Sequence, residues 1–194
     1  MKYSDLVKFK NGGMEIDEKG FSIMRAGNQS SQIGIFGISA GSDSKAAQIL
    51  GTKVLKLSRS GGGTGVWVPY LANCTVYGYL TGGQTWAASG PFSGCYYEVG
   101  TSNGQVYVAH ISCEERNDPN VEAWKSVLPN RTVLFSAKMS MSRNLPVGAS
   151  NAAAIAFASI SGGAVECTRV DVQTASFGGM TGPIFDVQPV ANGS

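Results

Sequence analysis

The stretch CYYEVGTSNGQVYVAHIS, residues 95–112, predicts a β-hairpin, and with it a fold built mainly of strands. Two runs rich in Tyr and Val, which favour strands, flank the turn-forming run TSNG at 101–104. The hairpin carries His110, the only histidine of the chain, fifteen residues after Cys95. The geometry of this hairpin therefore decides whether the imidazole and a thiol can meet.

Two turn types keep Cys95 and His110 on one face of the hairpin. A four-residue loop over 101–104 places them directly opposite each other. A two-residue Asn-Gly turn at 103–104 makes the pair diagonal, roughly 7 to 8 Å apart. A register shifted by one residue would separate them onto opposite faces. Glu98 has the opposite pleat parity to Cys95 and is expected to point away from it.

The rest of the chain continues the strand pattern, with short β-favouring runs separated by glycine-containing turns. Helices are predicted at 43–51 and at 118–128, where Asp118 is the N-cap and Pro119 the first helical residue. The run NAAAIAFASIS at 151–161 fits a buried strand or a helix, and its β-branched end followed by Gly-Gly favours a strand. Strands are expected at 21–26, 33–39, 53–58, 65–71, 74–80, 95–99, 105–112, 132–140, 153–160 and 165–174.

These elements predict an α+β fold that is mostly β, a single-domain mixed β-sandwich over residues 1–194 with a few flanking helices and long loops. The glycine-rich segments 58–65 and 81–91 and the polar segment 113–120 are expected to be loops at the rim of the site. The first of these, SRSGGGTG, lacks a following helix pattern and a Lys-[Ser/Thr] pair, which argues against a nucleotide-binding loop.

Composition excludes several classes of function. A chain of 194 residues with 43% hydrophobic residues and a net charge of +2 has a sizeable core and no basic stripe for nucleic acid. No apolar run is long enough to cross a membrane, and no Sec signal peptide is evident, so synthesis in a cytoplasm is expected. Four dispersed cysteines and one histidine make a poor zinc set, so free thiols are expected. We also expect a monomer.

Cys95 and His110 are the candidate catalytic residues. An imidazole can take the thiol proton, which leaves a thiolate nucleophile and an imidazolium acid. The small-residue turn before the cysteine adds candidate oxyanion donors, the N–H groups of Gly94 and Cys95 with Ser93 as a third. A structural alternative stays open, because cysteines are often buried and a lone strand histidine is often a core residue.

The remaining cysteines and the tryptophans are assigned to packing. None of the other thiols has a histidine available, so a buried structural role is expected for each. Trp86 lies near enough to Cys95 in the sequence to border a cleft. The residues concerned are Cys74, Cys113 and Cys167, with Trp67, Trp86 and Trp124.

The sequence FSGC at 92–95, followed by a strand, a turn and a strand bearing histidine, resembles the Leu-Ser-Gly-Cys motif and downstream histidine of the cytotoxic necrotizing factor catalytic domain and of the Burkholderia lethal factor. AHI at 109–111 is similar to the Ala-His-Ile of the chemoreceptor glutamine deamidases, which share that fold. VWVPYL at 66–71 is similar to a Trp-x-Pro strand segment of the lethal factor. Ser89 stands where the lethal factor and the chemoreceptor enzymes have the threonine that orients the histidine. The departures are Phe for Leu in the first motif and Ser for Thr, and the resemblance covers residues 66–112.

This resemblance implies a β-sandwich toxin or effector that deamidates a glutamine of a host protein without metal or cofactor. Cys95 would attack the carboxamide carbon, and His110 would protonate the departing ammonia and activate water. Ser89 or a main-chain carbonyl from residues 60–90 would hold His110, with no carboxylate on the ring. The chain would be made in a bacterial cytoplasm, exported, and active in the host cytosol. Of the two toxin families' targets, a DEAD-box translation initiation helicase is favoured over Rho-type GTPases, because the Trp-x-Pro segment and the Ser89 position are closer to the lethal factor.

Three alternatives remain. A chemoreceptor-type glutamine deamidase fits the same residues and would act on the cell's own receptors. A papain-like peptidase or cell-wall amidase fits poorly, because there the cysteine starts a helix and the histidine follows much later. From a different class, the chain could be a non-enzymatic β-sandwich binding module in which the Cys-His proximity is accidental.

Overall fold

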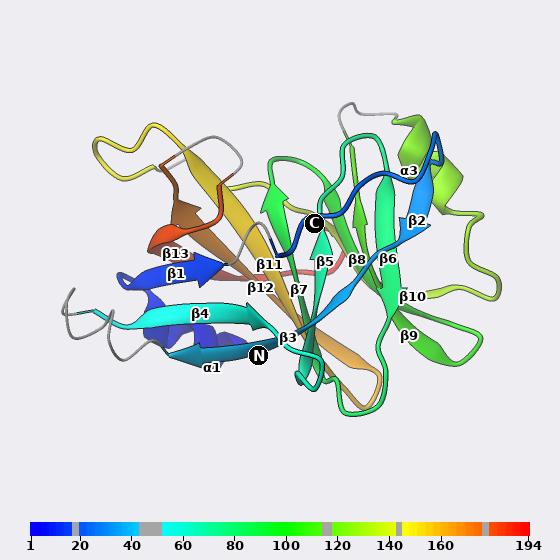
Figure 1. The fold of residues 1–194 in the computed structure, drawn as a ribbon, viewed down its shortest axis with the longest axis horizontal. Coiled ribbons are helices and arrows are strands. Elements are labelled where there is room, and N and C mark those ends of the chain that lie inside the picture. Colours follow the sequence, from blue (N-terminus) through cyan, green and yellow to red (C-terminus); the bar gives the residue numbers. More distant parts are fainter. Residues whose placement is uncertain (17–19, 43–51, 114–117, 143–144, 176–178) are drawn as a thin grey trace.

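A computed structural model describes residues 1–16, 20–42, 52–113, 118–142, 145–175 and 179–194 (Figure 1). Within these ranges strands dominate, and the helical segments are short. The helical segments are α1 (Tyr3–Leu6), the 3-10 helix η1 (Val7–Phe9) and α3 (Pro119–Trp124). The strands are β1 (Gly13–Ile16), β2 (Ser31–Ile33), β3 (Phe36–Ser42), β4 (Val54–Arg59), β5 (Gly65–Pro69), β6 (Thr75–Tyr79), β7 (Trp86–Phe92), β8 (Tyr96–Ser102), β9 (Gln105–Ile111), β10 (Thr132–Lys138), β11 (Ala152–Ser161), β12 (Ala164–Gln173) and β13 (Gly182–Val190).

Eight of the described strands form a closed barrel, in the order β1-β13-β12-β11-β7-β5-β3-β4. Parallel pairing of β1 with β4 completes the ring. The other five strands form a second sheet in the order β10-β8-β9-β6-β2, which lies beside the barrel in Figure 1 with α3 at its outer side.

The expected α+β sandwich with flanking helices is therefore wrong. The described chain is nearly all β, and a closed barrel replaces one layer of the expected sandwich. The barrel closes through β1 and β13, neither of which was among the predicted strands. Four residues are too few for a periodic signal in β1, and β13 contains two prolines, which count against a strand in sequence.

The barrel wall made by β5, β7 and β11 is buried on both of its faces. Trp67, Ala88 and Phe157 point inward and belong to the apolar core of the barrel. Their strand neighbours Val68 and Ala156 point outward and belong to a second core, between the barrel and the five-stranded sheet. This double burial explains why β11 shows an unbroken apolar run rather than an alternation.

Most of the predicted strands are present, with some differences. Segment 33–39 is divided between β2 and β3, and 21–26 forms no strand. The segment 81–91 was expected as a rim loop, but Trp86–Phe92 within it is β7, paired on both sides inside the barrel wall. Its Ala, Ser and Gly residues resemble a loop in sequence, whereas in the structure they let the strand pack closely between two cores.

The helix predicted at 118–128 begins as expected. The Asp118 carboxylate accepts a hydrogen bond from the Asn120 N–H at 2.8 Å, which caps the helix, and the helix ends at Trp124. The helix predicted at 43–51 lies outside the described residues. In the part of the chain that the structure describes, no helix has the length and apolar character needed to cross a membrane.

The outer face of the five-stranded sheet is closed by α3 around a buried carboxylate. Glu98, only 3% exposed, accepts hydrogen bonds from the Tyr107 hydroxyl at 2.7 Å and the Trp124 indole at 2.9 Å. It also forms an ion pair with Arg131, with 2.6 Å between Nη2 and Oε2. This network confirms that Glu98 points away from the face that carries His110.

Candidate active site

The hairpin of β8 and β9 closes through a two-residue turn. Asn103 and Gly104 have φ angles of 48° and 77°, the left-handed pair that a type I′ turn requires. Tyr97 is directly opposite His110, so Cys95, two residues before Tyr97, is the diagonal neighbour of His110 on the same face. The diagonal register is confirmed, and the register that placed the two residues directly opposite is wrong.

Both candidate residues lie in the core between the sheet and the barrel. His110 is 1% exposed and Cys95 is 6% exposed. The Cys95 carbonyl accepts a hydrogen bond from the Met139 N–H at 2.8 Å, which ties the start of β8 to the end of β10. The hairpin therefore supplies both groups on a firmly held, buried surface.

Ser89, on the outward face of β7, holds the imidazole. Its hydroxyl donates to the Val68 carbonyl, with 2.6 Å between the oxygens, and Oγ lies 2.8 Å from Nδ1 of His110. A hydroxyl has one proton, so Oγ can only accept from the ring, and Nδ1 must carry the hydrogen. The expected contact with an oxygen from the 60–90 region is thus present, with the hydroxyl at the ring and the carbonyl behind it.

A β-bulge in β7 brings a second residue against the same ring. Ser89 pairs with Ala156 and Phe92 with Ala154, so two residues of β7 stand opposite one residue of β11. The extra residue keeps Ser89 and Phe92 on one face although they are three positions apart. The Phe92 ring stacks on His110, with centroids 4.1 Å apart and planes at 8°.

The burial of His110 determines its charge. Desolvation lowers the pKa of the imidazole from its ordinary 6.5 to about 3, so the ring is neutral at neutral pH. The imidazolium expected in a resting ion pair with Cys95 is therefore disfavoured. With Nδ1 protonated, Nε2 has a lone pair, and among the described residues it has no hydrogen-bond partner.

The turn before Cys95 has the conformation that glycine favours. Gly94 has a φ of 139°, and Ser93 is exposed at the tip of the turn. Within the described part of the chain, no acceptor is found for the Gly94 N–H. The turn therefore offers a backbone donor and a hydroxyl directly before the thiol, as the oxyanion hypothesis requires.

The remaining cysteines take no part in this arrangement. None of the four cysteines is in a disulfide, and burial raises the pKa of Cys74 and of Cys167 above the ordinary range. Within the described ranges, no three His, Cys, Asp or Glu side chains are grouped so as to hold a metal ion.

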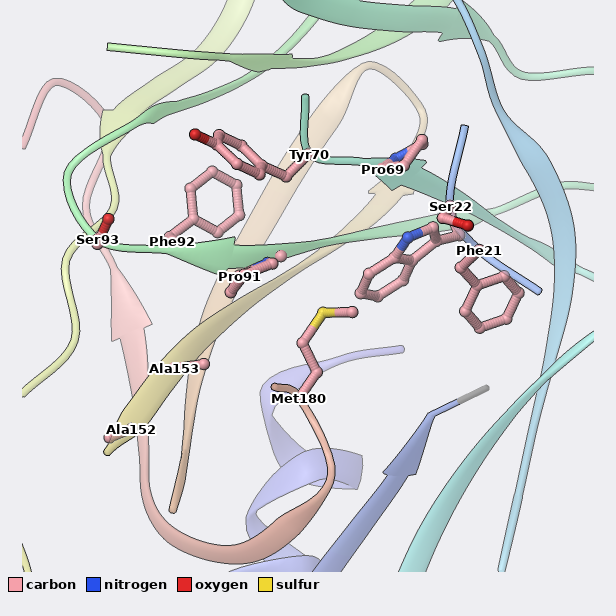
Figure 2. A pocket seen from close by; sticks show the side chains of 12 residues that line it. Phe21, Ser22, Pro69, Tyr70, Pro91, Phe92, Ser93, Ala152, Ala153 and Met180 are labelled. Atoms are coloured by element: carbon pink, nitrogen blue, oxygen red, sulfur yellow. The ribbon is translucent and has the colours of Figure 1, made fainter. Parts of the chain in front are cut away.

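Sequence reasoning did not identify Tyr70 and Phe92 as residues that contact the His110 ring. The Tyr70 ring lies 5.2 Å from the His110 ring, and it directly follows the Trp-x-Pro segment. Tyr70 and Phe92 also line a cavity of about 300 Å³ (Figure 2). Trp67 lines this cavity, whereas Trp86, expected at a cleft, packs in the barrel with its indole donating to the Thr64 hydroxyl at 3.1 Å.

Only part of the expected rim is described. The turn at 60–64 precedes β5, whereas Tyr70, whose ring lies near His110, follows the last residue of that strand. This turn therefore lies at the end of β5 that is far from His110. Residues 114–117 of the segment 113–120 lie outside the described residues.

No family model and no curated protein matches the chain. Among solved structures, it is similar to the C-terminal domain of CNFy from Yersinia pseudotuberculosis, with a TM-score of 0.28 and 9% sequence identity. The match covers 66% of this chain and 63% of that domain. The similarity is a weak one of fold, and the roles of the site residues rest on their own geometry.

Proposed function

We propose that this chain is a cysteine-dependent protein glutamine deamidase that works as a single catalytic domain. The observation that carries the proposal is the chain of contacts from the Val68 carbonyl through Ser89 to Nδ1 of His110. It leaves the Nε2 lone pair unengaged by the described residues, on the face that carries Cys95. A buried polar atom without a partner calls for an explanation, and a general base supplies one.

In the first half-reaction, the Cys95 sulfur attacks the carboxamide carbon of a glutamine while Nε2 takes the thiol proton. The N–H groups of Gly94 and Cys95, with the Ser93 hydroxyl, stabilise the oxyanion. The imidazolium then gives its proton to the departing nitrogen, so the C–N bond breaks and ammonia leaves. A thioester between the substrate and Cys95 remains.

In the second half-reaction, Nε2 takes a proton from water, and the resulting hydroxide attacks the thioester carbon. The C–S bond breaks, the sulfur recovers its proton from His110, and the glutamine has become glutamate. A neutral resting imidazole suits both steps, because each begins with the removal of a proton. Catalytic hydrogen bonds are often absent or long before substrate binds, so a hydrogen bond between the thiol and Nε2 is expected to form in the complex.

The substrate class rests on the motif resemblance. The FSGC turn and the downstream histidine resemble those of toxins that deamidate host proteins, so we propose a glutamine displayed by a folded host protein, reached after export into the host cytosol. A DEAD-box translation initiation helicase is favoured over Rho-type GTPases. We propose action as a monomer, without nucleic acid or membrane as a partner.

The test treats both purified candidate targets, and a host lysate, with the protein and with a Cys95→Ser variant. Ammonia release and a one-dalton gain at a glutamine peptide are expected with the wild type alone. Cys113→Ser is the matched control and should stay active, while His110→Ala should be nearly as inactive as Cys95→Ser because no second histidine can replace it. Retention of a tenth of the activity by Cys95→Ser would place the nucleophile elsewhere. Deamidation of the GTPase alone would reverse the preferred target.

A further inference from the structure

The wall of the cavity of about 300 Å³ includes two residues, Tyr70 and Phe92, whose rings contact His110 of the proposed dyad. Phe92 and Tyr70, whose rings lie against His110, form one end of it together with Ser93 (Figure 2). Ser93 is only two residues before Cys95. A group placed in the cavity would therefore lie beside any substrate attacked by the thiol.

The lining of this cavity is apolar. Trp67 and Met180 are 0% and 7% exposed, and Figure 2 shows Met180 between Ala153 on one side and Phe21 on the other. Phe21 stacks on Trp67, with centroids 5.4 Å apart, which fixes that wall. The only side-chain hydroxyls among the described lining residues are those of two serines and Tyr70, and none of these residues is charged.

Small residues keep the cavity open at the side of β11. Ala152 and Ala153 begin that strand and line the cavity, where a larger side chain would occupy it. On the neighbouring strand β7, which pairs with β11, Pro91 lies in the bulge and also lines the cavity. The space is thus enclosed by side chains from separate strands and loops, as binding pockets usually are.

We infer that this cavity binds a large apolar side chain, of the leucine, methionine or phenylalanine kind, that neighbours the target glutamine in the protein substrate. The inference rests on the proposed function and names how its substrate is recognised. The glutamine itself does not suit the cavity, because a carboxamide buried among aromatic and aliphatic groups would lose hydrogen bonds. An apolar cavity of about 150 Å³ can hold benzene, so about 300 Å³ accommodates such a side chain.

The binding test uses two small probes that differ only in the side chain, N-acetyl-phenylalanine amide and N-acetyl-glutamine amide. Each is titrated into ¹⁵N-labelled Cys95→Ser protein while the three tryptophan indole N–H signals are followed by NMR. We expect a saturable shift of the Trp67 signal with the phenylalanine amide alone, and no shift of Trp124 on the far face of the sheet. Equal shifts with both probes, or none with either, would overturn the inference.

Two variants block the cavity from different segments, Ala152→Phe from β11 and Ser22→Phe from the loop before β2. Both should abolish the Trp67 shift, whereas Ala164→Phe, at an exposed position of the same β11–β12 hairpin, should not. Because Ser22 is exposed, its substitution leaves the core intact even if Ala152→Phe lowers the melting temperature.

The kinetic test separates this inference from the proposed function. With whichever target protein is deamidated, the blocking variants should raise KM about ten- to hundredfold, the range expected when a buried apolar side chain is lost. The rate of Cys95 alkylation by iodoacetamide should stay unchanged. If both variants deamidate the target with an unaltered KM, the inference of an apolar subsite is wrong, while the proposed deamidase function is retained. Absence of any Cys95-dependent deamidation would overturn the proposed function, and the probe titration would still decide whether the cavity binds apolar groups.

Discussion

Ser89 carries a single hydroxyl proton, which it donates to the Val68 carbonyl, so it must accept a hydrogen bond from His110. This one residue therefore sets the imidazole tautomer. No carboxylate is needed for that purpose, and among the described residues none is hydrogen-bonded to the ring. The neutral, oriented imidazole is the state that a general base requires at the start of thiol attack.

Replacement of Ser89 tests this orientation. Ser89→Ala should lower kcat about a hundredfold with little change in KM, because the ring loses the acceptor that holds Nδ1–H. Ser89→Thr keeps the hydroxyl and should retain most of the activity. Comparable kcat values for the alanine and threonine variants would contradict the assigned role.

The buried imidazole also predicts a pH dependence of stability. The pKa of His110 is about 3 in the fold and about 6.5 when unfolded, so the unfolded chain binds the extra proton between these values. The contribution of His110 to the free energy of unfolding is therefore greatest above pH 6.5, where the ring is neutral in both states, and is lost as the pH falls toward 3. Between pH 6.5 and 4.5, the free energy of unfolding in urea should fall about 2 kcal/mol more in the wild type than in His110→Gln. Parallel pH curves for the two proteins would show that the ring titrates normally.

At the scale of elements, the β8–β9 hairpin has a different task on each face. Its inner face carries Cys95 and His110, and its outer face carries Glu98, which holds α3 and Arg131. Because the two faces are separate, stability and activity should respond to different substitutions.

Arg131→Met tests this separation. It leaves the Glu98 carboxylate buried without its counter-charge and should destabilise the fold by about 3 kcal/mol, while the rate of Cys95 alkylation stays unchanged below the unfolding transition. The matched control is Lys125→Met, which removes an exposed ion pair with Glu122 and should cost less than about 0.5 kcal/mol. Equal costs in urea unfolding would mean that the buried pair contributes no more than an exposed one.

At the scale of the whole molecule, the barrel closes where β1, β4 and β13 meet. The Gly13 N–H donates to the Lys53 carbonyl at 2.9 Å, and the Gly12 carbonyl accepts from the Ile184 N–H at 2.8 Å. A Cβ at Gly12 would lie 2.1 Å from the Lys53 carbonyl oxygen. The close approach of the two backbones at this joint therefore requires glycine.

Gly12→Ala should accordingly lower the free energy of unfolding by about 2 kcal/mol, since backbone must shift to admit the methyl group. Gly61→Ala is the control, because a Cβ there meets no atom within 4 Å, and it should change stability by less than about 0.5 kcal/mol. Urea unfolding of both variants measures the difference. If Gly12→Ala leaves the free energy of unfolding unchanged, the backbones where β1, β4 and β13 meet can shift without strain.

Local chemistry allowed much of the site to be predicted. The Asn-Gly turn, the strands beside it and the shared face of Cys95 and His110 follow from side-chain alternation and turn preference over eighteen residues. The cap at Asp118 follows in the same way. Ser89 was found only through a motif resemblance, because its contact with His110 joins residues that lie 21 positions apart.

The mainly β character, the hairpin and the identity of the candidate dyad could be predicted from the amino-acid sequence, because they depend on interactions between near neighbours. Three features became visible only in the three-dimensional fold: eight strands close into a barrel, segment 81–91 contains a strand of the barrel wall, and a bulge aligns Ser89 with Phe92. Such features arise where strands distant in the chain pair and where both faces of a strand are buried. There the pattern of apolar and polar residues that marks a single exposed face is lost.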